Sequence, residues 1–180
     1  MDNLDQFDLK QITIVNDSTA MAEDLVSSYY KMSAIQWLRP VYDVKTLVDL
    51  SPDEIVQGPF AQIIRYEGKR RDTSLGSSTY DFYKICIQDH AILSTLEKNV
   101  DITLFPFTLY IVTHELIHIV RFMKFLQIFT ATFDEKLAEE VRVHETTHNI
   151  LRNVRVEGLP DVLKFYHKWR EPIENMREPE

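Results

Sequence analysis

The chain has 180 residues, of which 44% are hydrophobic, and a formal net charge of −8 at pH 7. This length and apolar content suit one globular domain with a substantial core. The negative charge argues against nucleic acid or an anionic membrane as the main partner, because both repel an acidic surface. The single cysteine, Cys86, excludes an internal disulfide and a cysteine-based zinc site.

The ends of the chain are polar and differ from its apolar middle. We expect an N-terminal arm over residues 1–17, a single helical metal-binding domain over residues 18–170 and a disordered tail over residues 171–180. Within the arm, the β-branched residues 11–15 suggest a short strand or an extended segment. The acidic N-terminus lacks the pattern of a secretory signal, so a cytoplasmic location is expected.

Apolar residues at helical spacing dominate the rest of the chain. They predict helices over residues 19–38, 80–99, 107–129, 135–156 and 162–169. The sequence Ser51-Pro52-Asp53-Glu54 is typical of a helix start, so we expect a further helix through Ile64 that Gly58-Pro59 kinks or interrupts. Residues 67–79 are polar and contain two glycines, which predicts a mobile loop, and residues 102–105 are a second candidate strand.

These elements indicate a mainly α fold with at most a minor β element. The connection between residues 129 and 135 is short, so the two longest helices should form an antiparallel hairpin with the more apolar one at the centre. The central helix is not expected to cross a membrane. Its uncharged run from Ile102 to Thr113 is far shorter than the ~20 residues that a span needs.

The pentad His114-Glu115-Leu116-Ile117-His118 lies inside this central helix. Residues i and i+4 share one face of a helix, so the two histidines can hold one metal ion, with Glu115 beside an open coordination position. The pattern recurs in the next helix as His144-Glu145-Thr146-Thr147-His148, and four of the six histidines of the chain fall in the two pentads. The sequence therefore predicts a metal site between these helices.

A tight zinc site needs a third protein ligand, and the second helix offers several. Its apolar residues repeat at spacings of three and four, and this stripe carries Glu140 and His144 toward the core. We expect Glu140 to be the third ligand, with His144 as a competing or additional one, and Glu139 to face solvent. Alternative ligands, or residues that orient the ligands through hydrogen bonds, are His148, Glu145, Glu139, Asp89 and His90.

The pentad resembles the motif of the zincin metallopeptidases. That resemblance implies zinc bound by His114 and His118, with Glu115 as the general base that takes a proton from the attacking water. In the gluzincin branch the third ligand is a glutamate further along the chain, and Glu139 and Glu140 lie at a suitable distance. A peptide is the substrate that the resemblance implies, although zincins place their motif helix against a β-sheet whose edge strand binds the peptide, and few strands are predicted here.

Other readings of the same residues stay open. The Glu-x-x-His pairs Glu115–His118 and Glu145–His148 loosely resemble those of di-iron carboxylate bundles, which would favour iron or manganese. A non-catalytic, metal-stabilised module that senses metal or binds a partner is a third possibility. A buried cluster of hydrogen-bonded histidines and glutamates without metal is the fourth.

Overall fold

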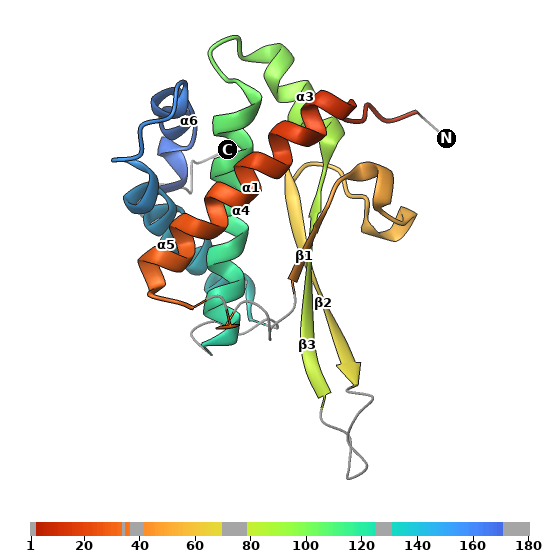
Figure 1. Cartoon of the computed structure of the whole chain (residues 1–180), viewed down its shortest axis with the longest axis vertical. Helices are drawn as coiled ribbons and strands as arrows, with labels where there is room; N and C mark the ends of the chain where they lie inside the picture. The colour runs from red at the N-terminus through yellow and green to blue at the C-terminus, as the bar shows by residue number, and fades with distance from the viewer. Residues whose placement is uncertain (1–2, 34, 37–41, 70–78, 125–130, 171–180) are drawn as a thin grey trace.

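The computed structural model describes residues 3–33, 35–36, 42–69, 79–124 and 131–170. The protein is mainly helical and has a small three-stranded sheet (Figure 1). Its elements in chain order are α1 (Leu9–Tyr30), β1 (Tyr42–Lys45), β2 (Ala61–Lys69), β3 (Thr79–Ile87), α3 (Asp89–Lys98), α4 (Leu104–Met123), α5 (Phe133–Leu151) and α6 (Leu159–Phe165). Short 3₁₀ turns lie at Leu47–Asp49, Pro52–Glu54 and His167–Arg170.

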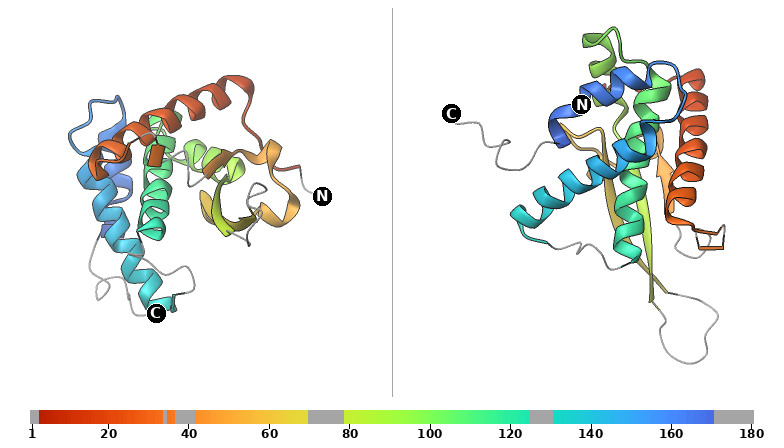
Figure 2. Two further views of the ribbon diagram at one scale, coloured as in Figure 1. Left: turned by 60° about the horizontal axis from the view of Figure 1, so that its bottom comes forward. Right: turned by 90° about the vertical axis from the view of Figure 1, so that its left-hand side faces the viewer.

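Helix α4 forms the centre of the molecule. Its side chains are apolar around most of the helix, and most of them from Leu104 to Val120 are buried. Helices α5 and α6 lie on one side of α4 and the sheet lies on the other, while α1 crosses it (Figures 1 and 2). A buried hydrogen bond of 2.8 Å between Ser18 and Thr108 joins α1 to α4. The described residues include no helix long and apolar enough to cross a membrane.

The sheet has the strand order β1-β3-β2, so β2 is an edge strand. Strand β3 pairs in parallel with β1 and antiparallel with β2, where Ile63 lies opposite Ile85. The side chains of Tyr83, Ile85 and Ile87 are buried at alternate positions of β3, and Tyr83 stacks on Phe122 of α4 with ring centroids 5.9 Å apart. The sheet therefore packs against α4 through one face.

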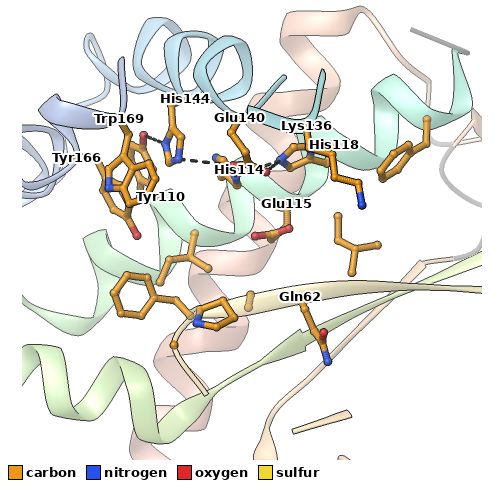
Figure 3. A pocket seen from close by; sticks show the side chains of 17 residues that line it. Gln62, Tyr110, His114, Glu115, His118, Lys136, Glu140, His144, Tyr166 and Trp169 are labelled. Atoms are coloured by element: carbon orange, nitrogen blue, oxygen red, sulfur yellow. Dashed lines mark hydrogen bonds and ion pairs between the residues drawn. The ribbon is translucent and has the colours of Figure 1, made fainter. Parts of the chain in front are cut away.

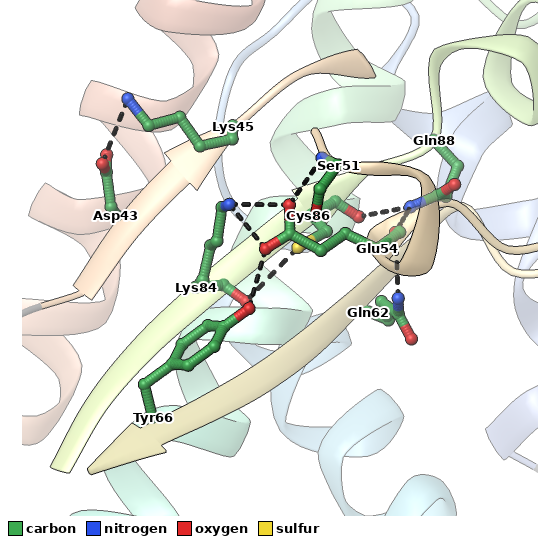
Figure 4. Close-up of polar contacts among 9 residues, drawn as sticks. All are labelled: Asp43, Lys45, Ser51, Glu54, Gln62, Tyr66, Lys84, Cys86 and Gln88. Carbon is green, nitrogen blue, oxygen red and sulfur yellow. Dashed lines mark hydrogen bonds and ion pairs between the residues drawn. The ribbon is translucent and has the colours of Figure 1, made fainter. Parts of the chain in front are cut away.

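A polar cluster around Glu54 fastens the 3₁₀ turn Pro52–Glu54 to strands β2 and β3 (Figure 4). The buried carboxylate of Glu54 accepts hydrogen bonds from Lys84 at 2.6 and 2.7 Å, from the Tyr66 hydroxyl at 2.7 Å and from the Ser51 backbone N–H at 2.9 Å. The ammonium of Lys84, followed by the other donors, lowers the pKa of Glu54 to about 2. The cluster thereby fixes the position of the turn Pro52–Glu54, which precedes Gly58 and strand β2.

The first helix differs from the prediction, because it begins at Leu9 and ends at Tyr30 instead of covering residues 19–38. Residues 11–15 belong to this helix and are neither a strand nor an extended arm. Asp8 is the N-cap and forms a capping box with Gln11, and Val15 begins a buried stripe that continues through Ser18, Ala22 and Val26. Val15 belongs to this stripe, and Ile12 and Ile14 are partly buried against the core, so packing and the cap override the preference of these residues for strands.

The region between residues 52 and 99 departs further from the predicted secondary structure than the first helix does. The helix predicted from Ser51 to Ile64 is wrong, since the chain makes one 3₁₀ turn and then enters β2. The helix predicted over residues 80–99 is β3 followed by α3, and residues 102–105 form no strand because α4 begins at Leu104. The ends of the predicted loop are wrong, since residues 67–69 belong to β2 and Thr79 belongs to β3. Residues 70–78 and the predicted tail over residues 171–180 lie outside the described residues.

Candidate metal centre

Two histidines of α4 form one side of the centre. His114 and His118 are one helical turn apart and are 8% and 5% exposed, so both imidazoles are fixed by their surroundings. Their Nε2 atoms lie 3.2 Å apart. The ring of His114 also packs on His144, with centroids 4.2 Å apart, and its buried Nδ1 has no hydrogen-bond partner among the described residues.

Helix α5 supplies the third member. Thr132 and Glu135 form a capping box that begins this helix and fixes its first turn, and Glu140 follows on the side that faces α4. The carboxylate of Glu140 lies 3.2 Å from Nε2 of His114 through Oε2 and 3.1 Å from Nε2 of His118 through Oε1 (Figure 3). The three side chains His114, His118 and Glu140 offer ligand atoms that all lie within 4.8 Å of one another. We call this group the triad.

The spacing of the triad is that of a tetrahedral zinc site. Ligand atoms about 2.0–2.1 Å from a tetrahedral ion stand about 3.3 Å apart. The three closest approaches among the imidazole nitrogens and the carboxylate are 3.1, 3.2 and 3.2 Å, although the two histidines meet different oxygens of Glu140. The residues present therefore fit zinc without a change of backbone.

Hydrogen bonds alone leave one contact of the triad unfavourable. If both histidines donate to Glu140, two N–H groups face each other across 3.2 Å. If His118 donates to His114 instead, the nitrogen lone pair of His114 faces a carboxylate oxygen at 3.2 Å. A cation between the three groups makes all three contacts favourable, because every ligand atom then directs a lone pair to positive charge.

The electrostatics of Glu140 and Glu115 differ. Desolvation would raise the pKa of Glu140, but hydrogen bonds from His114 and His118 outweigh it and hold that pKa well below its usual range. Glu115, by contrast, has its pKa raised, chiefly by desolvation, while the two histidines act in the opposite direction. Glu115 is not in the triad and its side chain points into the adjoining cleft (Figure 3).

This cleft has a volume of about 630 Å³ and lies between the triad and strand β2. Gln62 and its neighbours Ala61 and Ile63 line it from β2. An aromatic group lines one end: Tyr110 and Tyr166 stack with centroids 3.9 Å apart, and Trp169 stacks on His144 at 5.6 Å. The cleft therefore joins a polar centre to an aromatic wall.

His144 was predicted as a ligand, and the structure places it beside the triad. Its Nδ1 is 2.8 Å from the Tyr110 hydroxyl, and its Nε2 is 3.8 Å from a carboxylate oxygen of Glu140. Among the described residues, the group of ligand atoms within mutual reach comprises His114, His118 and Glu140 and does not include His144. His144 thus forms part of the wall of the centre, between Glu140 and the aromatic residues.

Glu139 was predicted to face solvent, and this is wrong. The side chain is 7% exposed and forms an ion pair with Arg121 of α4, and Arg142 lies 2.9 Å from its second oxygen. The arginines turn Glu139 away from the triad, so it fastens α5 to α4 next to the centre. The buried residues of α5 accordingly form a stripe somewhat different from the predicted one: Glu139, Val143, His144, Thr147 and Leu151.

The other predicted residues lie outside the triad. Glu145 is exposed and His148 is partly buried on α5. On α3, Asp89 is buried and accepts hydrogen bonds from the backbone N–H groups of Phe7 and Leu47. It therefore links α3 to the segment before α1 and to the turn Leu47–Asp49. Neither ring nitrogen of His90 has a hydrogen-bond partner among the described residues. None of these four residues lines the cleft.

Sequence reasoning missed the β2 residues and the aromatic wall. Gln62 was assigned to a helix, and only its pairing with β3, distant in the sequence, makes it part of an edge strand. Tyr166 and Trp169 come after α6, well beyond the end of α5 in the sequence, and Tyr110 was not singled out within the predicted central helix. Its position one turn before His114 was the one available signal, since residues i and i+4 share a face.

No protein-family model matches this chain, and comparisons with curated proteins and with solved structures find no significant match. Its function therefore has to be argued from the chemistry of the centre.

Proposed function

We propose that this chain is a zinc-dependent peptidase in which His114, His118 and Glu140 hold the ion. The observation that carries the proposal is the set of three mutual approaches of 3.1–3.2 Å among these side chains. Two imidazoles and one carboxylate are a ligand set of catalytic zinc sites, which keep a position open for water or substrate. The proposal includes the antiparallel pairing of α4 and α5, supported by contacts that join Tyr110 to His144 and Arg121 to Glu139.

Glu115 is the proposed general base. It follows His114 directly in the chain and extends into the cleft, whereas the two histidines face Glu140 on α5 (Figure 3). A bound zinc ion would polarise both a water molecule and the carbonyl group of the substrate. Glu115 takes a proton from the attacking water and passes it to the leaving nitrogen.

The Tyr166 hydroxyl is the proposed donor to the carbonyl oxygen. Tyr166 is 6% exposed, its hydroxyl points into the cleft, and no described residue accepts its hydrogen bond (Figure 3). Burial raises the pKa of this hydroxyl well above its usual value, which keeps it protonated. A fixed donor of this kind stabilises the negative charge that develops on oxygen during attack.

Strand β2 supports a peptide as the substrate. It is an edge strand of the sheet, and its residues Ala61, Gln62 and Ile63 line the cleft opposite Glu115. An extended peptide can add to such an edge through backbone hydrogen bonds. The zincins that the pentad resembles bind peptides on an edge strand, and the sheet supplies the element that the sequence did not predict.

The di-metal alternative has less support among the described residues. Such a bundle needs further carboxylates from other helices, and the two available ones are occupied. Glu23 accepts a hydrogen bond from Tyr42, and Glu54 is ion-paired with Lys84 on the far side of the sheet. A closed structural site would need a fourth protein ligand, which the triad lacks among these residues.

The test combines metal content with peptide cleavage in one variant. Glu115→Gln keeps the shape of the side chain and removes the base, so zinc stoichiometry should equal that of wild type while hydrolysis of a quenched-fluorescent peptide library is lost. His118→Ala should lose both. Loss of metal from Glu115→Gln would instead identify Glu115 as a ligand and favour the di-metal reading, with iron or manganese in the purified protein.

A further inference from the structure

The cleft has two chemically different ends. Tyr166 and Trp169 lie on one side of His114 and Glu115, and Lys136 lies on the other (Figure 3). A chain lying along β2 would pass the aromatic wall, the triad and then the lysine. The two ends can therefore select the residues on either side of the bond that reacts.

Lys136 has no ion pair or hydrogen bond with any described residue. It is the fourth residue of α5, near the helix N-terminus, where the helix dipole disfavours a positive charge. Glu140 follows it by four residues but is engaged with the two histidines. Among the described residues, no carboxylate thus forms an ion pair with Lys136, although Asp134 and Glu135 lie in the same helical turn.

The other end is aromatic and carries no charged lysine or arginine among the residues that line the cleft. The stacked rings of Tyr110 and Tyr166 and the ring of Trp169 border it, and Phe60 approaches from the start of β2. Aromatic walls of this kind favour large apolar side chains, which bury much surface against the rings. The end of the cleft at Lys136 carries one positive charge, which the aromatic end lacks.

From this asymmetry we infer that the cleft selects peptides in which a carboxylate on one side of the reacting bond pairs with Lys136 and a large apolar side chain on the other side packs against the aromatic wall. This inference rests on the proposed peptidase function and adds the substrate class to it. The carboxylate comes either from an aspartate or glutamate side chain or from the end of the peptide.

The experiment uses the zinc-loaded full chain and matched peptides. Each peptide carries one phenylalanine and, two to four residues away, either glutamate or glutamine, and each is made with a free and an amidated C-terminus. We expect wild type to prefer the glutamate or the free-end peptide by about threefold to fivefold in kcat/KM, the range of a partly exposed ion pair. The difference should lie in KM and should shrink at high salt.

The variants isolate the charge. Lys136→Gln should abolish the preference, and Lys136→Glu should reverse it toward a lysine-containing peptide. Lys10→Gln is the matched control, because Lys10 is also an exposed lysine in the first turn of a helix but lies outside the cleft. It should keep the wild-type preference.

Binding separates this inference from the proposed function. Fluorescence anisotropy of labelled peptides on the zinc-loaded Glu115→Gln protein, with and without Lys136→Gln, needs no turnover. A carboxylate preference in binding without hydrolysis by wild type would support recognition by Lys136 and remove the peptidase proposal. Equal binding of the glutamate, glutamine, free and amidated peptides, or a preference that survives Lys136→Gln, would overturn the inference even if peptides are cleaved, and Lys136 would then be a solvated lysine only.

Discussion

Glu139 and Glu140 are adjacent on α5 but have different partners. Glu139 pairs with Arg121, whereas Glu140 lies between His114 and His118. Successive residues of a helix point about 100° apart, so the two carboxylates separate toward different parts of the surface of α4. The pair thereby divides two tasks, because one residue joins the helices and the other completes the triad.

Alanine variants of these two residues should separate metal binding from stability. Glu140→Ala removes a proposed ligand and should lower zinc affinity by more than about 100-fold, since even the loss of a residue that only supports a ligand costs about 10–100-fold. Glu139→Ala should leave zinc binding nearly unchanged but lower the free energy of unfolding by about 3 kcal/mol, because Arg121 loses its carboxylate partner in a largely buried setting. Zinc titration and urea unfolding of both variants measure this, and the reverse pattern would make Glu139 the ligand.

Tyr166→Phe should affect the chemical step of the proposed reaction. The variant keeps the stacked ring and removes the hydroxyl that points into the cleft. Loss of one donor to a developing oxyanion costs roughly 100- to 1000-fold in kcat, with KM and zinc content little changed. Tyr110→Phe is the matched control, since its hydroxyl contacts His144. A kcat that falls equally in both variants would show that the aromatic stack, and not the Tyr166 hydroxyl, is what matters.

The sequence predicted what depends on local spacing. Helices α4 and α5 were found because their periodicity is long, and the facing of His114 and His118 follows from four residues of helical rise. Strands β2 and β3 were missed because Tyr80, Tyr83 and Ile87 fit helical spacing as well as alternation does. Whether this segment becomes a strand or a helix depends on the pairing of β2 with β3, for example of Ile63 with Ile85, and these residues are distant in the sequence.

The same limit applies to the centre. An apolar stripe on α5 suggested that Glu140 faces α4, but it could not show that Glu139 would be buried while Glu140 stays partly exposed. That depends on Arg121, which lies on another helix and was not considered as a partner. Likewise the spacing of residues 162–169 predicts a helix, but it does not specify that Tyr166 stacks on Tyr110.

The Glu54 cluster should make stability depend on pH in acid. The folded state lowers the pKa of Glu54 from 4.5 to about 2, so its contribution is present above pH 4.5 and is lost as the pH falls toward 2. Glu54→Gln should therefore destabilise the protein by about 1–3 kcal/mol at pH 7 and by progressively less below pH 4.5. Urea unfolding of wild type and variant at several pH values checks this, with Glu145→Gln as an exposed control. A difference that does not change with pH would contradict the ion pair with Lys84.

Removal of zinc should lower the stability of the folded chain. An ion that binds only the folded state stabilises it by about 2.7 kcal/mol when its free concentration is 100 times the dissociation constant. A chelator should therefore lower the unfolding midpoint of wild type and of Glu115→Gln, which keeps all three ligands, but should not change that of His118→Ala. Zinc should likewise be released as the pH falls and the imidazoles bind protons. Thermal unfolding with and without chelator measures the effect, and equal midpoints for wild type in both conditions would show that the triad holds no metal.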